Sequence, residues 1–141
     1  MKLNTDKLKH ISLTDALTEL PNRRAFDEKL DKEWKRTKRE CENLSIILMD
    51  IDYFKRYNDS LGHLIGDRCL TEVSKGLLSL QKNEDDIIVR FGGEEFLLVF
   101  YQDDGDTAQL KKRIEQVCPT IEALNISHPS SDISEYVTVS A

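Results

Sequence analysis

The sequence predicts one α/β (α+β) domain in which helices flank a central antiparallel sheet, with elements in the order β-α-α-β-β-α-β. The first observation is a short apolar run at residues 44–51, which suits a buried strand and is too short to span a membrane. The second is a pair of runs rich in β-branched and aromatic residues, 86–91 and 97–101, which flank two glycines and predict a β-hairpin. A chain of 141 residues is long enough for one such core.

Two helices are expected before the apolar run. Residues 3–12 are expected to form the end of one helix, and residues 22–40 are expected to form the next. In the second helix Phe26, Leu30 and Trp34 recur every four residues, which predicts a buried stripe along one side.

A helical stretch is expected after the strand at 44–51, with a break near Gly62 and a continuation to about residue 80. The hairpin follows at about residues 86–101. Its paired glycines, Gly92 and Gly93, are expected to supply the positive φ angles that a tight turn needs.

The last elements are a helix and a strand. A turn at residues 103–106 is expected to start a helix that ends near Val117 and is closed by Pro119. Residues 127–134 are expected to form a serine-rich loop, and residues 136–139 a final strand.

Composition restricts the partners. The net charge is −6, with 11 basic and 9 acidic side chains in residues 1–43 and 9 basic and 17 acidic in residues 44–141. The acidic part argues against a nucleic-acid surface, which would need clustered Lys and Arg. No signal peptide or membrane segment is visible, and the three widely spaced cysteines form no CxxC pair. We therefore expect a cytoplasmic domain with no nucleic-acid or membrane contact.

Two aspartates end the apolar run. Because strand side chains alternate, Asp50 and Asp52 should lie on one face of the strand, at its carboxyl end. A carboxylate there is costly unless it is paired or binds metal. We interpret Asp50 as a metal ligand, and we favour for Asp52 the role of cap of the next helix.

Two glutamates, Glu94 and Glu95, follow the paired glycines at the tip of the hairpin. The fold gains nothing from carboxylates at this position. Glycines have no side chain to block a close approach, so the pair suits a metal-bound phosphate. Taken alone, the same residues are also typical of an ordinary solvated turn.

Three blocks, residues 15–23, 50–67 and 90–96, resemble the GGDEF family of diguanylate cyclases, with Gly-Gly-Glu-Glu-Phe as the signature. The resemblance implies the palm fold of polymerases and class III nucleotide cyclases, which has a ferredoxin-like order of elements. It assigns residues 13–141 to the GGDEF domain and residues 1–12 to the end of a signalling or linker helix.

The activity implied by the resemblance is condensation of two GTP into cyclic di-GMP and two pyrophosphates, in bacterial second-messenger signalling. The family works as a homodimer in which each subunit holds one GTP and two Mg²⁺ or Mn²⁺ ions. An upstream sensor or receiver domain is a further expectation. Catalysis would come mostly from positioning and from charge stabilisation by the metals.

The resemblance also implies roles for single residues. Asp50, the carbonyl of Ile51 and Glu94 would bind the metals, and Glu95 would lie near the attacking hydroxyl as a base or second carboxylate. The remaining implied substrate-binding residues are Tyr53, Phe54, Lys55, Gly92 and Gly93 for the phosphates and Asn58 and Asp67 for guanine.

The roles of two further residues, His63 and Arg90, are less specific. His63 is expected at the edge of the base pocket, and Arg90 either contacts substrate or only holds the hairpin through a salt bridge. For Asn58 and Asp67, taken outside the matched block, a helix cap or a surface position is the alternative.

Feedback inhibition in the family uses an Arg-x-x-Asp motif, whose positions here are Asn83 and Asp86. Asparagine lacks the charge and the planar fork of arginine, so the inhibitory site is interpreted as degenerate. The family pattern also continues beyond residue 141 into a helix with Lys and Arg that hold the triphosphate. We therefore expect this chain by itself to have weak or no activity.

Two other functions stay open. One is a non-enzymatic GGDEF module that binds GTP or a protein partner, and the retained glutamates Glu94 and Glu95 argue against it. The other is a cyclase that makes mixed or adenine-containing dinucleotides, and Asp67 argues against it.

Overall fold

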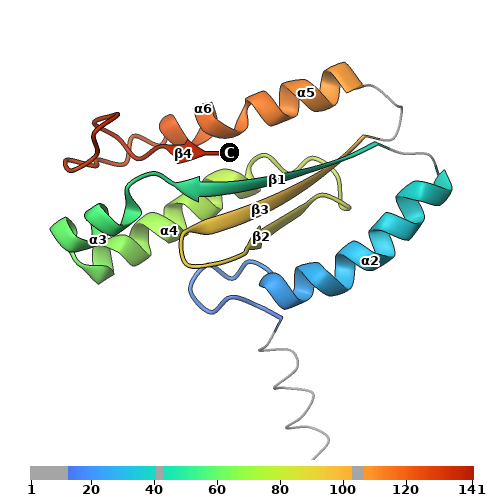
Figure 1. The fold of residues 1–141 in the computed structure, drawn as a ribbon, viewed down its shortest axis with the longest axis horizontal. Coiled ribbons are helices and arrows are strands. Elements are labelled where there is room, and N and C mark those ends of the chain that lie inside the picture. Colours follow the sequence, from blue (N-terminus) through green and yellow to red (C-terminus); the bar gives the residue numbers. More distant parts are fainter. Residues whose placement is uncertain (1–12, 41–42, 103–106) are drawn as a thin grey trace, which may run out of the picture.

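The computed structural model describes residues 13–40, 43–102 and 107–141 (Figure 1). The structure confirms the predicted α/β fold, an antiparallel four-stranded sheet flanked by helices, but two helices stand where one was expected before the last strand. The elements are α2 (Arg23–Glu40), β1 (Asn43–Ile51), α3 (Phe54–Leu61), α4 (His63–Leu78), β2 (Ile87–Arg90), β3 (Glu95–Gln102), α5 (Thr107–Glu115), α6 (Val117–Glu122) and β4 (Val139–Ser140). The helix expected at residues 3–12 and the turn expected at 103–106 lie outside the described residues.

The strands follow the order β2-β3-β1-β4, and every neighbouring pair is antiparallel. β1 and β3 pair along most of their length, and this ladder ends with Asp50 opposite Glu95. On its other side Asp50 lies opposite Ser140 of β4. The register therefore brings the end of β1 and the start of β3 to the same edge of the molecule.

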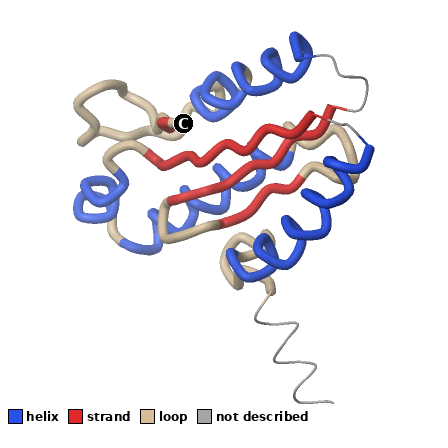
Figure 2. Tube along the Cα trace, turned by 45° about the vertical axis from the view of Figure 1, so that its right-hand side comes forward, coloured by secondary structure: helices blue, strands red, loops and turns tan. Residues whose placement is uncertain are grey.

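The two faces of the sheet are covered differently (Figures 1 and 2). On one face Ile47, Met49 and Ile51 of β1 belong to the main core, together with residues from α3, α4, α5 and α6. On the other face Phe26 of α2 packs against β2 and β3 in a smaller cluster. Among the described residues, α2 covers β2 and β3 but leaves Ile46 and Leu48 on the outer face of β1 exposed.

The predicted stripe on α2 is wrong at Trp34. Phe26 is buried and Leu30 is partly buried, but the side chain of Trp34 is 56% exposed. Ile46 and Leu48 on the open face of β1 are each 51% exposed. Four-residue periodicity reports which side chains share one side of a helix, but it does not report where the covered part of the sheet ends.

The break near Gly62 is confirmed. Gly62 has φ 89° and separates α3 from α4, and its amide donates to the carbonyl of Asn58 at 2.8 Å. The expectation for the hairpin glycines is wrong, because Gly62 is the one glycine with positive φ among the described residues. The loop spans residues 91–94, and amides of Phe91 and Gly92 donate to the carbonyl of Glu95. Longer hairpin loops of this kind are built on right-handed turns and do not require positive φ.

The C-terminal elements differ in detail from the expectation. α5 ends at Glu115, and Pro119 lies in the first turn of α6, where a proline is tolerated, so it does not close the helix. The strand expected at 136–139 is shorter and later, at Val139–Ser140, with an isolated bridge from Ser127 to Tyr136. No helix in the described part of the chain is long and apolar enough to cross a membrane.

Candidate active site

The end of β1 and the tip of the hairpin meet at one edge of the sheet. Asp50 faces Glu95 in the strand register, and the amide of Ile51 donates to the carbonyl of Glu94 at 3.3 Å. The side chains of Asp50 and Glu94 are close enough for each to affect the pKa of the other. The structure therefore gathers the four residues that the sequence analysis assigned to metal binding and base catalysis.

The carboxylates at this edge repel one another. Burial, followed by the charges of Glu95 and Asp52, raises the pKa of Asp50. Burial, followed by the charges of Asp50 and Glu95, raises the pKa of Glu94. Neither Asp50 nor Glu94 has a Lys or Arg ion-pair partner among the described residues. Carboxylates with raised pKa values and no cationic partner are typical of a functional site.

The donor set fits a hard divalent cation. In the part of the chain that the structure describes, no three His, Cys, Asp or Glu side chains are arranged as a complete metal cage. Mg²⁺ does not need one, because it binds through one or two carboxylates and completes its shell with water and substrate phosphates. Asp50 and Glu94 with the nearby carbonyl of Ile51 supply such a partial set. The oxygen donors do not fit zinc, which prefers nitrogen and sulfur.

The hairpin tip is bare beside these carboxylates. A Cβ built on Gly93 would meet no atom within 4 Å, and one built on Gly92 would meet only Glu95, at 3.6 Å or more. The fold therefore has no internal steric need for either glycine.

Asp52 does not cap α3, which corrects the expectation. The residue before α3 is Tyr53, and no side chain caps the helix. The Asp52 carboxylate instead accepts hydrogen bonds from the hydroxyls of Thr138 at 2.8 Å and Ser140 at 2.6 Å. The amide of Asp52 donates to the carbonyl of Thr138 at 3.0 Å, so Asp52 ties β1 to the C-terminal segment.

Tyr53 lies in the left-handed region, with φ 56° and ψ 33°. This conformation costs a residue other than glycine roughly 1–2 kcal/mol. It turns the chain sharply from β1 into α3, so that the first amides of α3 follow directly after the acidic edge. Helix N-terminal amides without carbonyl partners are suited to phosphate oxygens.

The side chains of this turn differ in availability. Phe54 is buried and its ring stacks against Tyr57, with centroids 6.0 Å apart, so only its backbone can meet a ligand. Lys55 is exposed on the first turn of α3. Arg56 pairs with Asp132 at 2.7 Å and lies over the ring of Tyr53.

The α3–α4 junction holds the predicted guanine residues. The side-chain oxygen of Asn58 is buried and has no hydrogen-bond partner. It packs so closely on Gly66 that a Cβ there would lie 1.7 Å from it, so Gly66 makes room for the amide. Asp67 is the next residue and is exposed on α4, and His63 is exposed at the start of α4. A buried amide oxygen without a hydrogen-bond partner is rare.

A sequence model of the family described as "Diguanylate cyclase, GGDEF domain" matches residues 12–141. The chain belongs to the GGDEF family. Among curated relatives, the diguanylate cyclase DgcP of Pseudomonas aeruginosa is 47% identical over 88 residues, which are 62% of this chain and 13% of that protein. The diguanylate cyclase DgcZ of Escherichia coli is 36% identical over 125 residues, covering 88% of this chain and 40% of DgcZ.

Solved structures agree with the fold. The coiled coil and GGDEF domain of DgcB from Caulobacter crescentus, in complex with c-di-GMP, matches with a TM-score of 0.80 at 25% identity, over 99% of this chain and 72% of that one. The diguanylate cyclase SiaD of P. aeruginosa, in complex with its activator SiaC, matches at 0.77 and 34% identity, over 99% of this chain and 51% of SiaD.

The chain spans less than half the length of these curated relatives. Another relative, the cyclic di-GMP phosphodiesterase NbdA of P. aeruginosa, is 36% identical over 110 residues, 77% of this chain and 14% of NbdA. Similar domains therefore occur in proteins that are named for different reactions.

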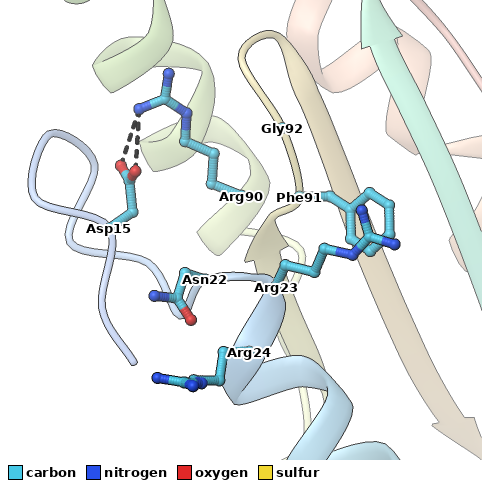
Figure 3. Close-up of a pocket in the computed structure, with 7 residues that line it drawn as sticks. All are labelled: Asp15, Asn22, Arg23, Arg24, Arg90, Phe91 and Gly92. Carbon is cyan, nitrogen blue, oxygen red and sulfur yellow. Dashed lines mark hydrogen bonds and ion pairs between the residues drawn. The ribbon is translucent and has the colours of Figure 1, made fainter. Parts of the chain in front are cut away.

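The side chain of Arg90, in the GGDEF signature block, binds Asp15 and the backbone of the hairpin. One terminal nitrogen contacts both carboxylate oxygens of Asp15 at 3.1 Å (Figure 3). The other donates to the carbonyl of Gly93 at 2.9 Å. Burial alone would raise the pKa of Asp15, but hydrogen bonds from Thr18 and Arg90 lower it. Of the two alternatives for Arg90, this geometry is the one expected of a residue that holds the hairpin.

An open cavity of about 390 Å³ lies beside Arg90, between the hairpin and the start of α2. Figure 3 shows the guanidinium group of Arg23 over the ring of Phe91, at 4.5 Å from the ring centre. Asp15, which completes the ion pair of Arg90, was not predicted as a functional residue. Its position at the start of the first matched sequence block was the available signal.

The positions expected for the inhibitory motif, Asn83 and Asp86, are used by the fold. Asp86 is 2% exposed, and its carboxylate binds Arg113 of α5 and the amides of Lys82, Asn83 and Tyr101. The side chain of Asn83 donates to the carbonyl of Tyr101 at 3.2 Å. All of these partners are within the domain, so the Asp86 carboxylate has no free face for a ligand.

Sequence reasoning missed the C-terminal contribution to the β1–α3 turn. Thr138, Ser140 and His128 all contact the backbone or side chains of residues 52–53. Nothing in the local sequence around His128 indicated this contact, because its partner lies 75 residues earlier in the chain.

Proposed function

We propose that the intact protein is a diguanylate cyclase that condenses two GTP into cyclic di-GMP and two pyrophosphates. The observation that carries the proposal is the meeting of Asp50 and Glu94, two carboxylates with raised pKa values, beside a bare glycine tip. The family membership, with diguanylate cyclases among the relatives, supports the same reaction.

Asp50, Glu94 and the carbonyl of Ile51 would hold two Mg²⁺ or Mn²⁺ ions. When bound, these ions supply charge stabilisation for the phosphate oxygens and lower the pKa of the attacking hydroxyl. The mutual repulsion of the carboxylates is relieved when cations arrive, so the site is organised for them before binding.

The other residues at this edge bind, orient and accept a proton. Glu95 would lie near the attacking 3′-hydroxyl as base or second carboxylate. The amides of Tyr53 and Phe54, with Lys55, would hold the phosphates, and Gly92 and Gly93 would let the nucleotide approach the hairpin.

Guanine recognition would fall to Asn58 and Asp67, with His63 at the edge of the base pocket. Guanine presents N–H donors at N1 and N2, which suit the carboxylate of Asp67 and the unpartnered oxygen of Asn58. Adenine has an acceptor at N1, so it would leave the carboxylate without a donor. Sites that hydrogen-bond a substrate reject analogues that lack the matching group.

Catalysis would require a homodimer. Cyclic di-GMP contains two equivalent linkages, and each domain has one such acidic edge, so two copies facing each other would each contribute one GTP. An upstream sensor or receiver domain would control that pairing, in keeping with the coiled coil of DgcB and the activator of SiaD.

A non-enzymatic module that binds GTP or a protein partner is the second candidate. It is supported by relatives such as the phosphodiesterase NbdA, whose name gives a different activity. Both acidic residues of the signature, Glu94 and Glu95, are present here, and that favours the enzyme.

The test is to incubate the purified full-length parent protein with GTP and Mg²⁺ and to identify the product by mass. We expect cyclic di-GMP, and we expect Asp50→Asn and Glu94→Gln each to abolish it. Glu72→Gln, an exposed acid on α4 paired only with Lys75, is the matched control and should retain activity. Undiminished turnover in either site variant would overturn the metal assignment, and the absence of product from the wild type would favour the non-enzymatic candidate.

Feedback through the degenerate positions is not expected. Asn83 lacks a positive charge, and the Asp86 carboxylate is already used by Arg113. Titration of cyclic di-GMP into the protein by calorimetry should show no tight site that depends on Asn83. A tight site that disappears in Asn83→Ala would contradict this.

A further inference from the structure

The segment after α6 wraps around the turn between β1 and α3. Thr138 and Ser140 hold the Asp52 carboxylate, and Asp132 pairs with Arg56 of α3. The most buried residue among those that make these contacts is His128, which is 1% exposed. The fold thus brings an ionisable ring from the C-terminal loop to the place where the phosphate-binding turn begins.

The ring of His128 has a defined hydrogen-bonding state. Its Nε2 lies 3.0 Å from the carbonyl oxygen of Tyr53. A carbonyl can only accept, so Nε2 carries the proton. The Nδ1 atom lies 3.4 Å from the hydroxyl of Ser130, which can donate to it.

The backbone of the loop holds this ring in place. The amide of His128 donates to the carbonyl of Glu135 at 2.8 Å, and the amide of Val137 donates to the carbonyl of Ile126 at 2.7 Å. The ring also packs edge-to-face with the ring of Tyr57, with centroids 5.1 Å apart and planes at 80°. His128 therefore contacts both ends of the first turn of α3, at Tyr53 and at Tyr57.

Tyr53 is the strained residue of this turn. Its ψ angle sets the direction of its carbonyl, and that carbonyl accepts from the amide of Tyr57 at 3.1 Å as well as from His128. A non-glycine residue remains in the left-handed region only when its surroundings hold it there. The hydrogen bond from the buried His128 ring can hold Tyr53 in this conformation from outside α3.

We propose that His128 is a positioning residue for the phosphate-binding turn: its Nε2–H holds the Tyr53 carbonyl, and through it the left-handed turn that aims the first amides of α3. The identity of the ligand, the phosphate chain of GTP, rests on the proposed function. The positioning itself is a property of the unliganded protein.

Hydrogen exchange of the full-length protein without nucleotide tests the positioning directly. The reporting amide is that of Tyr57, which donates to Tyr53, and the internal reference is the amide of Gly66, which donates to Gly62 in the first turn of α4. In His128→Phe we expect exchange at Tyr57 to become about tenfold faster, the effect of one lost hydrogen bond, while exchange at Gly66 stays unchanged. His128→Gln, whose side-chain amide can donate to the same carbonyl, should restore the slow rate.

Substrate kinetics provide the second measurement. We expect His128→Phe to raise KM for GTP about tenfold with a much smaller change in kcat, because ground-state phosphate binding is weakened. Tyr53→Gly in the His128→Phe background should recover part of the lost affinity, because glycine adopts the left-handed conformation without support. Ser130→Ala removes only the partner of Nδ1 and should leave both measurements near the wild-type values.

The outcomes separate the two proposals. Equal acceleration at Tyr57 and Gly66 in His128→Phe, or failure of His128→Gln to restore Tyr57, would overturn the positioning role. If His128→Phe does not fold, His128→Leu takes its place in the same comparison. If the wild type makes no cyclic di-GMP, the proposed function fails, and exchange at Tyr57 still decides the role of His128.

Discussion

The pKa of Asp86 is shifted in the opposite direction to the pKa values of Asp50 and Glu94. Burial alone would raise the pKa of Asp86, but hydrogen bonds from Arg113 and from three backbone amides lower it. Burial and neighbouring negative charges raise the pKa values of Asp50 and Glu94, and no cationic side chain among the described residues pairs with them. A carboxylate whose partners all come from the fold stabilises the fold, whereas carboxylates that the fold leaves uncompensated are available to a ligand cation.

Asp86→Ala should give the largest effect on stability. It leaves the guanidinium of Arg113, 3% exposed, in the core without its partner. Breaking a buried ion pair from one side costs about 3–5 kcal/mol in the free energy of unfolding, measured by urea denaturation. Loss of most of the stability of a small domain is therefore the expected result.

The matched control is the exposed pair of Asp31 and Lys35 on α2, whose side chains are 69% and 73% exposed. Asp31→Ala should cost less than about 0.5 kcal/mol. Because the folded-state pKa of Asp86 is lowered, its contribution is present above the unfolded value of about 3.9 and is lost as the pH falls through the folded value. The stability gap between wild type and Asp86→Ala should therefore narrow in acid, and a gap that widens there would contradict the assignment.

Some features of the fold and the site could be predicted from the sequence alone. The apolar run of β1, the break at Gly62 and the hairpin are local signals, and the structure confirms all three. The meeting of Asp50 with Glu94 was also predictable, because the resemblance assigns both residues to the same metal site.

Long-range partners were not predictable. The helix cap assigned to Asp52 was wrong because its carboxylate binds Thr138 and Ser140, 86 and 88 residues later. Arg113 is 27 residues from Asp86, so a motif that includes only Asn83 and Asp86 could not indicate this structural ion pair. Local patterns report propensity and periodicity, whereas partners of buried polar groups depend on which elements the fold brings together.

Adding a divalent metal ion should have the next largest effect on the free energy of unfolding. It should act only through Asp50 and Glu94. Adding Mg²⁺ or Mn²⁺ at ten to a hundred times its dissociation constant should stabilise the wild type by about 1–3 kcal/mol. Chelation should reverse the shift, which thermal unfolding would follow. Glu94→Gln should lose the response and Glu72→Gln should keep it. A full response in Glu94→Gln would mean that the cation binds elsewhere.

Asp50→Asn should give the smallest effect, with a sign opposite to that of Asp86→Ala. In the metal-free protein at neutral pH it removes one charge from a repelling group, so the free energy of unfolding should rise. We expect a gain below about 1 kcal/mol, because Asp50 is partly solvated and water screens the repulsion.

The pH dependence of the free energy of unfolding tests the sign of this gain. The folded-state pKa of Asp50 is raised, so its charge destabilises the wild type above that pKa, and the penalty disappears as the pH falls below the unfolded value of about 3.9. The advantage of Asp50→Asn should therefore be present at neutral pH without metal, vanish in acid, and reverse when Mg²⁺ stabilises the wild type alone. Urea denaturation at both pH values, with and without Mg²⁺, measures all three. A metal-free Asp50→Asn that is less stable than the wild type at neutral pH would show that Asp50, like Asp86, serves the fold.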